Sequence, residues 1–187
     1  NVKNTDMVID IDDEDSQRLL RLFNTPEGRT YLKEELRLAP ELVEQLTWLG
    51  ISGIANVLCC IKMAKYYEFT SRDVVGTVLT DSAAMYQSRI GELNGEYGAY
   101  TVHEAALDHG VHMLAVKTDS MQELTYADRK RVHNLKYYTW VEQQGKTVEE
   151  LNALWYEGIW DAVHAQAKDL DELIDAFNEA TGLLKAL

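Results

Sequence analysis

The chain has few cysteines, few prolines and no long apolar run. Only two of its 187 residues are cysteines, the neighbours Cys59 and Cys60. Because they lie in a predicted buried helix, we interpret them as small core residues and not as a disulfide framework or a metal pair. No apolar segment approaches the roughly 18 residues that span a membrane, and the N-terminus has no signal-peptide pattern. We therefore expect a cytoplasmic protein that does not enter the membrane.

Basic residues are also scarce. The 18 lysines and arginines are outnumbered by 31 aspartates and glutamates, which gives a formal net charge of −13. Such a charge repels the phosphates of nucleic acids, and no basic stripe offsets it, so we do not expect a nucleic-acid partner. The length and a hydrophobic content of 46% are sufficient for one domain with a sizeable core.

The clearest pattern is a strand, a helix and a second strand in succession. Residues 7–11 are a short β-branched run, residues 54–67 are apolar on most faces, and residues 74–79 are an almost continuous β-branched run. A run without alternation is typical of a central parallel strand that is covered on both faces. We therefore predict an α/β fold: a βαβ part of an open, mostly parallel sheet, with flanking helices and a helical C-terminal extension.

The other segments are expected to be mostly helical. Thr25 and Pro26 are typical of a helix N-cap and the first helical residue, and Thr147 begins a capping box with Glu150. Gly110 is expected to end a helix over residues 103–109. Further helices are predicted over residues 16–23, 29–38, 41–48, 126–140, 147–155 and 169–184, a short strand over residues 111–116, and a surface excursion over residues 86–100.

Two glycines flank a serine directly before the apolar helix, in the stretch Gly50-Ile51-Ser52-Gly53. This pattern predicts a tight turn that leads into a helix N-terminus, where free N–H groups and the positive end of the helix dipole can hold a ligand. Ser52 could contact such a ligand, or it could simply cap the helix.

A second polar pair, Asp81-Ser82, follows the apolar run at residues 74–79. Ligands of open α/β sheets bind at the carboxyl ends of strands, so we expect this pair to lie on the same edge of the sheet as Ser52. The alternative is that Asp81-Ser82 forms an ordinary turn after a strand.

No metal site is predicted. His103, His109 and His112 are close in sequence, but they do not form an i, i+4 pair on one helix together with a converging carboxylate. The acidic run at residues 12–15 lacks the glycine and the distal glutamate of a calcium loop, and we interpret it as a solvated helix start.

Four features follow one another along the chain: Gly50-Ile51-Ser52-Gly53, a helix with Ala64-Lys65, the apolar run at residues 74–79, and Thr80-Asp81-Ser82 followed by Tyr86. In this order they resemble the C-terminal half of the cysteine synthase and cystathionine β-synthase family. These are pyridoxal-phosphate enzymes of fold type II, the group similar to tryptophan synthase β. The matching region is residues 7–86. The family usually has proline where this chain has Thr80, and polar residues where it has Ala83-Ala84-Met85.

The resemblance implies a division of the chain and a cofactor site. Residues 1–100 would be the C-terminal portion of a domain that binds pyridoxal 5'-phosphate, with inserted helices at about residues 29–48. Residues 101–187 would be a mostly helical extension packed on the same domain. Ser52 would contact the pyridine nitrogen of the cofactor, Asp81 and Ser82 would lie near the ring edge, and Gly50 would let the backbone approach it.

The resemblance also implies that part of the active site lies elsewhere. The family's Schiff-base lysine and glycine-rich phosphate loop precede the matching region, and Lys3, Lys33, Lys62 and Lys65 do not lie in a comparable context. No catalytic residue is therefore expected in this chain, and an N-terminal half or a second subunit would supply them. The expected function is β-elimination or β-replacement on a small cysteine- or serine-like amino acid, in an oligomer. The alternative is a non-catalytic interaction or assembly subunit that retains the fold.

Overall fold

The computed structural model describes residues 2–182, which form two compact units. The larger unit is Ile9–Gln122, and the smaller unit consists of residues 2–8 and 123–182. The expected boundary after residue 100 falls inside the larger unit. Of the predicted helix over residues 169–184, the last two residues lie outside the described part of the chain.

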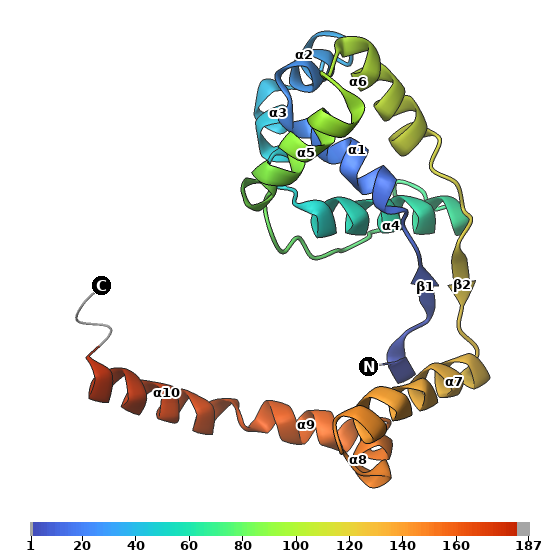
Figure 1. The fold of residues 1–187 in the computed structure, drawn as a ribbon. Helices are drawn as coiled ribbons and strands as arrows, with labels where there is room; N and C mark the ends of the chain where they lie inside the picture. Colours follow the sequence, from blue (N-terminus) through green and yellow to red (C-terminus); the bar gives the residue numbers. More distant parts are fainter. Residues whose placement is uncertain (1, 183–187) are drawn as a thin grey trace. The chain divides into compact units, whose positions relative to one another are not determined.

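The larger unit is built from helices (Figure 1). They are α1 (Asp13–Asn24), α2 (Pro26–Glu34), α3 (Pro40–Leu46), α4 (Ile51–Tyr66), the 3-10 helix η2 (Ala83–Tyr86), α5 (Gln87–Tyr97), α6 (Val102–His109) and the π-helix η3 (Gly110–Leu114). Helix α1 contacts α2, α4, α5 and α6, so it is the central element of this unit.

The sequence around α1 explains where this helix begins and why it is buried. Asp12 is the N-cap, and its side chain accepts a hydrogen bond from the N–H of Glu14. The acidic residues of the first turn, Asp13, Glu14 and Asp15, interact favourably with the positive end of the helix dipole and so stabilise the helix. Leu19, Leu20 and Leu22 are almost completely buried and form the core together with residues of α2, α3 and α4. Such residues on adjacent positions of one helix require neighbours on several sides.

The smaller unit is also helical. It contains η1 (Val2–Asn4), α7 (Tyr126–Tyr137), the π-helix η4 (Tyr138–Gln143), α8 (Val148–Ala153), α9 (Glu157–Ala165) and α10 (Ala167–Thr181). Its core is small: Leu124, His133, Leu151 and Trp155 are buried.

Two helix starts confirm the local predictions made from the sequence. In the larger unit Thr25 caps α2, with Pro26 as its first residue, and in the smaller unit Thr147 opens α8 with a capping box.

The predicted fold class is wrong. The chain is 68% helical, and its described residues contain one sheet, of two short antiparallel strands. These are β1 (Met7–Ile9) and β2 (Met121–Glu123), and Figure 1 shows them side by side. There is accordingly no open, mostly parallel sheet and no βαβ part within residues 2–182.

The apolar run at residues 74–79 has no regular secondary structure and is not a strand. Val74 is 95% exposed and Val78 is 68% exposed. A central strand needs neighbours that pair with its backbone and cover both faces, and the described residues supply only the Nδ2 of Asn56, which donates to the carbonyl of Val78 over 2.8 Å. The residue pattern therefore predicted a covering layer that the described chain does not contain.

The predicted helix over residues 103–109 is confirmed as α6, with Gly110 as its C-cap residue, although the φ of Gly110 is −64° and not left-handed. The predicted strand over residues 111–116 is wrong, because the chain continues from Gly110 into the π-helix η3. The expected surface excursion at residues 86–100 contains the regular helix α5, most of whose residues are exposed. Within residues 2–182, no single helix is long and apolar enough to cross a membrane, and α3 and α4 meet such a criterion only as a pair bent by 113°.

Substitution of Gly28 by alanine is expected to destabilise the larger unit. A Cβ atom at this position in α2 would fall on the backbone carbonyl of Leu22, which cannot move without disturbing α1. We expect the free energy of unfolding to decrease by about 1–3 kcal/mol, the usual cost of overpacking. Chemical denaturation followed by circular dichroism measures the change.

Gly91→Ala is the matched control, because Gly91 is an exposed residue of α5 and a Cβ there meets no atom within 4 Å. Its expected effect is a gain of roughly 0.5–1 kcal/mol from the lower backbone entropy of the unfolded chain. Equal effects of the two substitutions would contradict the proposed clash.

Candidate functional site

The candidate site begins at the N-terminus of α4. Gly50 is the N-cap and has no side chain to satisfy the first N–H groups of the helix, and Ser52 is the second helical residue. The capping interpretation of Ser52 is therefore wrong. Its side chain is exposed and makes no hydrogen bond to another residue of the described part. The first turn of α4 thus has free donors and a free hydroxyl group.

Backbone hydrogen bonds bring the segment around Asp81 to this helix end. The N–H of Gly50 donates to the carbonyl of Asp81 over 2.9 Å, and the N–H of Ala83 donates to the carbonyl of Thr47 over 3.3 Å. The expected proximity of the two polar stretches is therefore present, but it arises from these two bonds and not from a sheet edge. Ser82, which is partly buried, precedes the short helix η2 as its N-cap residue.

Gly50 is required by the contact with Asp81 itself. A Cβ atom at position 50 would lie 2.6 Å from the Oδ2 and 2.9 Å from the carbonyl oxygen of Asp81. Both distances are shorter than a normal contact of a Cβ atom. The glycine is thus explained by packing within the chain, without the approach of a cofactor.

Two hydroxyl groups hold the carboxylate of Asp81. Tyr86 donates a short hydrogen bond to Oδ2, and the Thr80 hydroxyl donates to Oδ1 over 2.7 Å. The hydrogen bond from Tyr86, followed by that from Thr80, lowers the pKa of Asp81, and the same interaction raises the pKa of Tyr86. Asp81 is consequently an anion near neutral pH, and it can accept hydrogen bonds or attract a cation but cannot act as a proton donor there.

The lysines considered for cofactor attachment are engaged elsewhere. Lys33 pairs with Glu44 over 3.2 Å, and Lys3 pairs with Glu157 over 3.6 Å. Lys65 donates to two backbone carbonyls at the end of η3 and just beyond it, and the buried Lys62 donates to the carbonyl of Asp10. Each of these amines therefore has a structural role in this arrangement.

A cavity of about 310 Å³ in the larger unit is lined in part by Lys62. Its polar lining residues are Asp10, Asp12, Glu14, Asp15, Lys62, Lys117, Asp119 and Ser120. Lys62 pairs with Asp119 over 3.3 Å and donates to the carbonyl of Asp10 over 2.9 Å. Its ammonium group therefore joins the loop after η3 to the segment that precedes α1. None of the predicted site residues lines this cavity.

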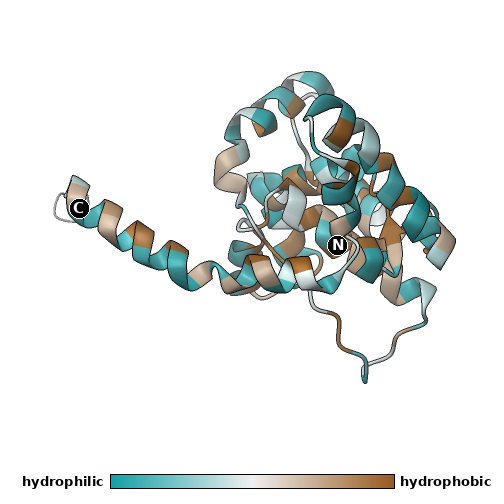
Figure 2. Cartoon of the chain, turned by 90° about the horizontal axis from the view of Figure 1, so that it is seen from below, coloured by the Kyte–Doolittle hydropathy of each residue, from teal (hydrophilic) through white to brown (hydrophobic). Residues whose placement is uncertain are grey.

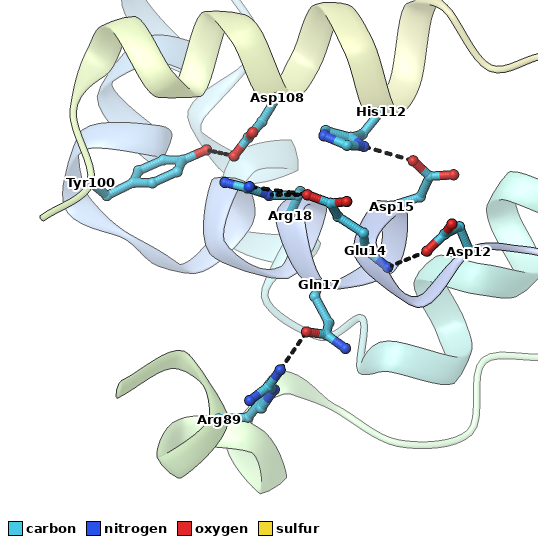
Figure 3. Close-up of polar contacts among 9 residues, drawn as sticks. All are labelled: Asp12, Glu14, Asp15, Gln17, Arg18, Arg89, Tyr100, Asp108 and His112. Carbon is cyan, nitrogen blue, oxygen red and sulfur yellow. Dashed lines mark hydrogen bonds and ion pairs between the residues drawn. The ribbon is translucent and has the colours of Figure 1, made fainter. Parts of the chain in front are cut away.

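Several polar contacts lie along α1, within the helix and toward α5 and η3 (Figure 3). Arg18 bonds to Glu14 within the helix, and Arg89 of α5 donates to Gln17 over 2.6 Å. His112 of η3 lies 2.6 Å from a carboxylate oxygen of Asp15. These contacts connect α1 to the helices on two of its sides.

Sequence reasoning missed two buried ionisable groups near these contacts, Arg21 and Asp108. Arg21 is completely buried, where its Nε and Nη2 donate to Asn94 and its Nη1 has no partner among the described residues. Asp108 accepts a hydrogen bond from Tyr100 over 2.8 Å. Burial raises the pKa of Asp108 and of Tyr100. The only signal for Arg21 was its position inside the run Leu19–Phe23, which is apolar on both sides.

Two of the three histidines that are close in sequence, His109 and His112, have partners other than a metal. His109 faces the hydroxyl of Tyr31 over 3.0 Å and His112 pairs with Asp15. Within residues 2–182, no group of three or more histidine, cysteine, aspartate or glutamate side chains is arranged to hold a metal ion.

No protein-family model, curated protein or solved structure significantly matches the chain. Three features of the described residues can therefore indicate a function. They are the uncapped N-terminus of α4, the free hydroxyl of Ser52 and the carboxylate of Asp81 beside Gly50.

Tyr86→Phe is expected to raise the pKa of Asp81 toward the usual carboxyl value of about 3.9, because it removes the stronger of two donors to this carboxylate. Thr80→Ala should raise it by a smaller amount. NMR titration of the aspartate side-chain carbons measures both changes. The control is Tyr137→Phe in α7, which should leave Asp81 unaffected. An unchanged Asp81 pKa in Tyr86→Phe would show that the hydrogen bond does not form in solution.

Asp108→Asn should alter the pH dependence of stability while keeping an acceptor for Tyr100. The pKa of Asp108 is raised by burial, so folding disfavours its charged form above that pKa. As the pH falls from neutral to about 4, the wild type should gain stability relative to the variant, because folded Asp108 takes up a proton before the unfolded chain does. Denaturation curves at several pH values measure this difference. With Asp161→Asn in α9 as the control, an exposed aspartate, a difference for Asp108→Asn that does not vary with pH would contradict the prediction.

Proposed function

We propose that this chain forms the distal part of a pyridoxal-phosphate-dependent enzyme of amino-acid metabolism. The reaction would be β-elimination or β-replacement on a small cysteine- or serine-like amino acid. The observation that carries the proposal is the N-terminus of α4, where the exposed hydroxyl of Ser52 has no partner among the described residues and Gly50 leaves the first N–H groups uncapped. A ring nitrogen with one lone pair or one proton is a suitable partner for such a hydroxyl.

The chemistry of Ser52 favours some reactions over others. When bound, the cofactor withdraws electrons from the α-carbon of an amino acid through its pyridine ring. A neutral hydroxyl at the ring nitrogen holds its position without keeping it protonated, as a carboxylate would. Ser52 would thus make the ring a weaker electron acceptor, which favours loss or exchange of a β-substituent over transamination.

Gly50, Asp81 and Ser82 would form the surroundings of the ring. The two hydroxyl groups at Asp81 fix its carboxylate, and the bond from Gly50 to the Asp81 carbonyl fixes the loop relative to α4. These residues can orient one edge of the cofactor. The amines of Lys62 and Lys65 are engaged in the contacts that join η3 and α1 to α4, so an N-terminal half or a second subunit would supply the Schiff-base lysine and the phosphate loop.

The apolar run at residues 74–79 supports such a partner. Val74, Val78 and Leu79 are each more than half exposed, although their residue types favour burial. Their segment ends directly at Thr80 and Asp81, so a polypeptide that covers it would lie next to the candidate site. An oligomer located in the cytoplasm agrees with the acidic charge and the free cysteines.

A non-catalytic assembly subunit is the second candidate. The same exposed run favours it, because binding another polypeptide requires no cofactor. Gel analysis and intact mass of the protein purified from its source separate the two candidates. The enzyme requires a lysine and a glycine-rich loop in the same polypeptide or in a companion of roughly 200 residues or more, the usual size of such a domain.

Ser52→Ala should weaken binding of pyridoxal phosphate by the protein with its companion region about 3- to 10-fold, the usual effect of one lost hydrogen bond. Quenching of protein fluorescence on titration with the cofactor measures the affinity independently of activity. Ser88→Ala is the matched control, because Ser88 is also an exposed second residue of a helix, α5.

Equal affinities of wild type, Ser52→Ala and Ser88→Ala would exclude Ser52 as a cofactor contact. Absence of any pyridoxal-phosphate binding by the assembled protein would reject the enzyme and leave the assembly subunit.

A further inference from the structure

Helix α10 presents an apolar stripe that the described residues of its own chain leave uncovered. Leu170, Leu173, Ile174 and Phe177 follow the spacing i, i+3, i+4 and i+7, and each is at least half exposed. No residue of this 15-residue helix is buried. Figure 2 shows apolar and polar residues interleaved along it. A stripe of this kind is typical of a helix that packs against a partner surface.

The charge of α10 restricts what that partner can be. The helix has one basic residue, Lys168, and five acidic residues, which gives a net charge of 1 − 5 = −4. At 100° per residue, Asp169 and Asp171 lie on opposite sides of the stripe. A second α10 helix or an anionic membrane surface would place like charges beside these aspartates, so a basic partner is favoured.

The chain itself offers a matching surface on α7. This helix has four basic residues and one acidic residue, for a net charge of 4 − 1 = +3 with histidine neutral. Arg129 pairs with Asp6, and Lys130 lies over the ring of Trp155. Among the described residues, Arg131 and Lys136 have no carboxylate within ion-pair distance.

The face of α7 that holds Arg131 also has apolar residues for the stripe to contact, and Lys136 lies at about 140° from Arg131, to the side of this face. Arg131, Leu135 and Tyr138 follow the spacing i, i+4 and i+7, so they share one face where α7 passes into η4. Leu135 is 52% exposed and Tyr138 is 59% exposed. This basic and apolar face is complementary in both respects to the acidic and apolar α10.

We propose that α10 of one copy packs on the α7 face of a second copy, and that the second copy does the same in return. Both surfaces remain exposed within a single chain. A reciprocal exchange covers both of them twice and closes the assembly as a two-fold dimer, without open ends that would add further copies. The apolar stripe supplies the buried area, and the flanking charges align the two helices. The proposal is independent of the proposed cofactor site.

The mass of the full chain in solution tests the dimer. Light scattering on a size-exclusion column should give twice the 21.3 kDa of one chain. The dimer should dissociate more readily as the salt concentration rises, because exposed charge pairs are screened. Leu173→Ser should weaken dimerisation by about tenfold or more, as expected for a central interface residue. Leu42→Ser, at a partly exposed leucine of α3, is the control and should not affect it.

Charge reversal distinguishes exchange between two copies from folding back within one chain. One variant combines Arg131→Glu with Lys136→Glu, and the other combines Asp169→Lys with Asp171→Lys. Each variant alone should be monomeric. An equal mixture should form a heterodimer, because one contact then places the native aspartates opposite native basic residues and the other places the introduced lysines opposite the introduced glutamates. A monomeric wild type at low salt, a dimer unaffected by Leu173→Ser, or a mixture that remains monomeric would each overturn the proposal.

Discussion

The burial of α1 is the constraint on which the larger unit depends. This helix has buried leucines on adjacent positions, so it must be covered on several sides, and α2, α4, α5 and α6 provide that cover. Complete enclosure also buries Arg21, which donates hydrogen bonds to Asn94 and to the carbonyl of Gly98, lies over the ring of Tyr100 and interacts electrostatically with Asp108. Polar contacts shown in Figure 3 also connect α1 to its neighbours, through Arg89 of α5 and His112 of η3.

Local features were predictable from the sequence, because they depend on residues close together in the chain. The N-cap at Thr25 with Pro26 and the capping box of Thr147 need only three or four neighbouring residues. Helices α1 and α4 were predicted at about the right residues for the same reason. The strand at residues 74–79 was not, because a strand exists only if other segments pair with it, and β propensity cannot show whether they are present.

The candidate site was predictable in part. Its two polar stretches were placed together for the wrong reason, since two backbone hydrogen bonds and not a sheet edge connect Gly50 and Thr47 to the segment that begins at Asp81. The buried pair of Tyr100 and Asp108 was missed because the two residues lie on either side of the start of α6, and no pattern in the sequence shows that both side chains turn inward. The π-helix at η3 was missed because the same residues resemble a short strand by composition.

The threonine at position 80 has a consequence for the loop that follows the exposed run. The Thr80 side chain is a hydrogen-bond donor, and it holds one oxygen of Asp81 while Tyr86 holds the other. A proline would stiffen the backbone but could make no such bond. The orientation of the carboxylate is therefore set by two side-chain hydroxyl groups and not by ring rigidity. Unlike a fixed backbone angle, these two hydrogen bonds lie at or near the surface and can be opened by solvent or a ligand.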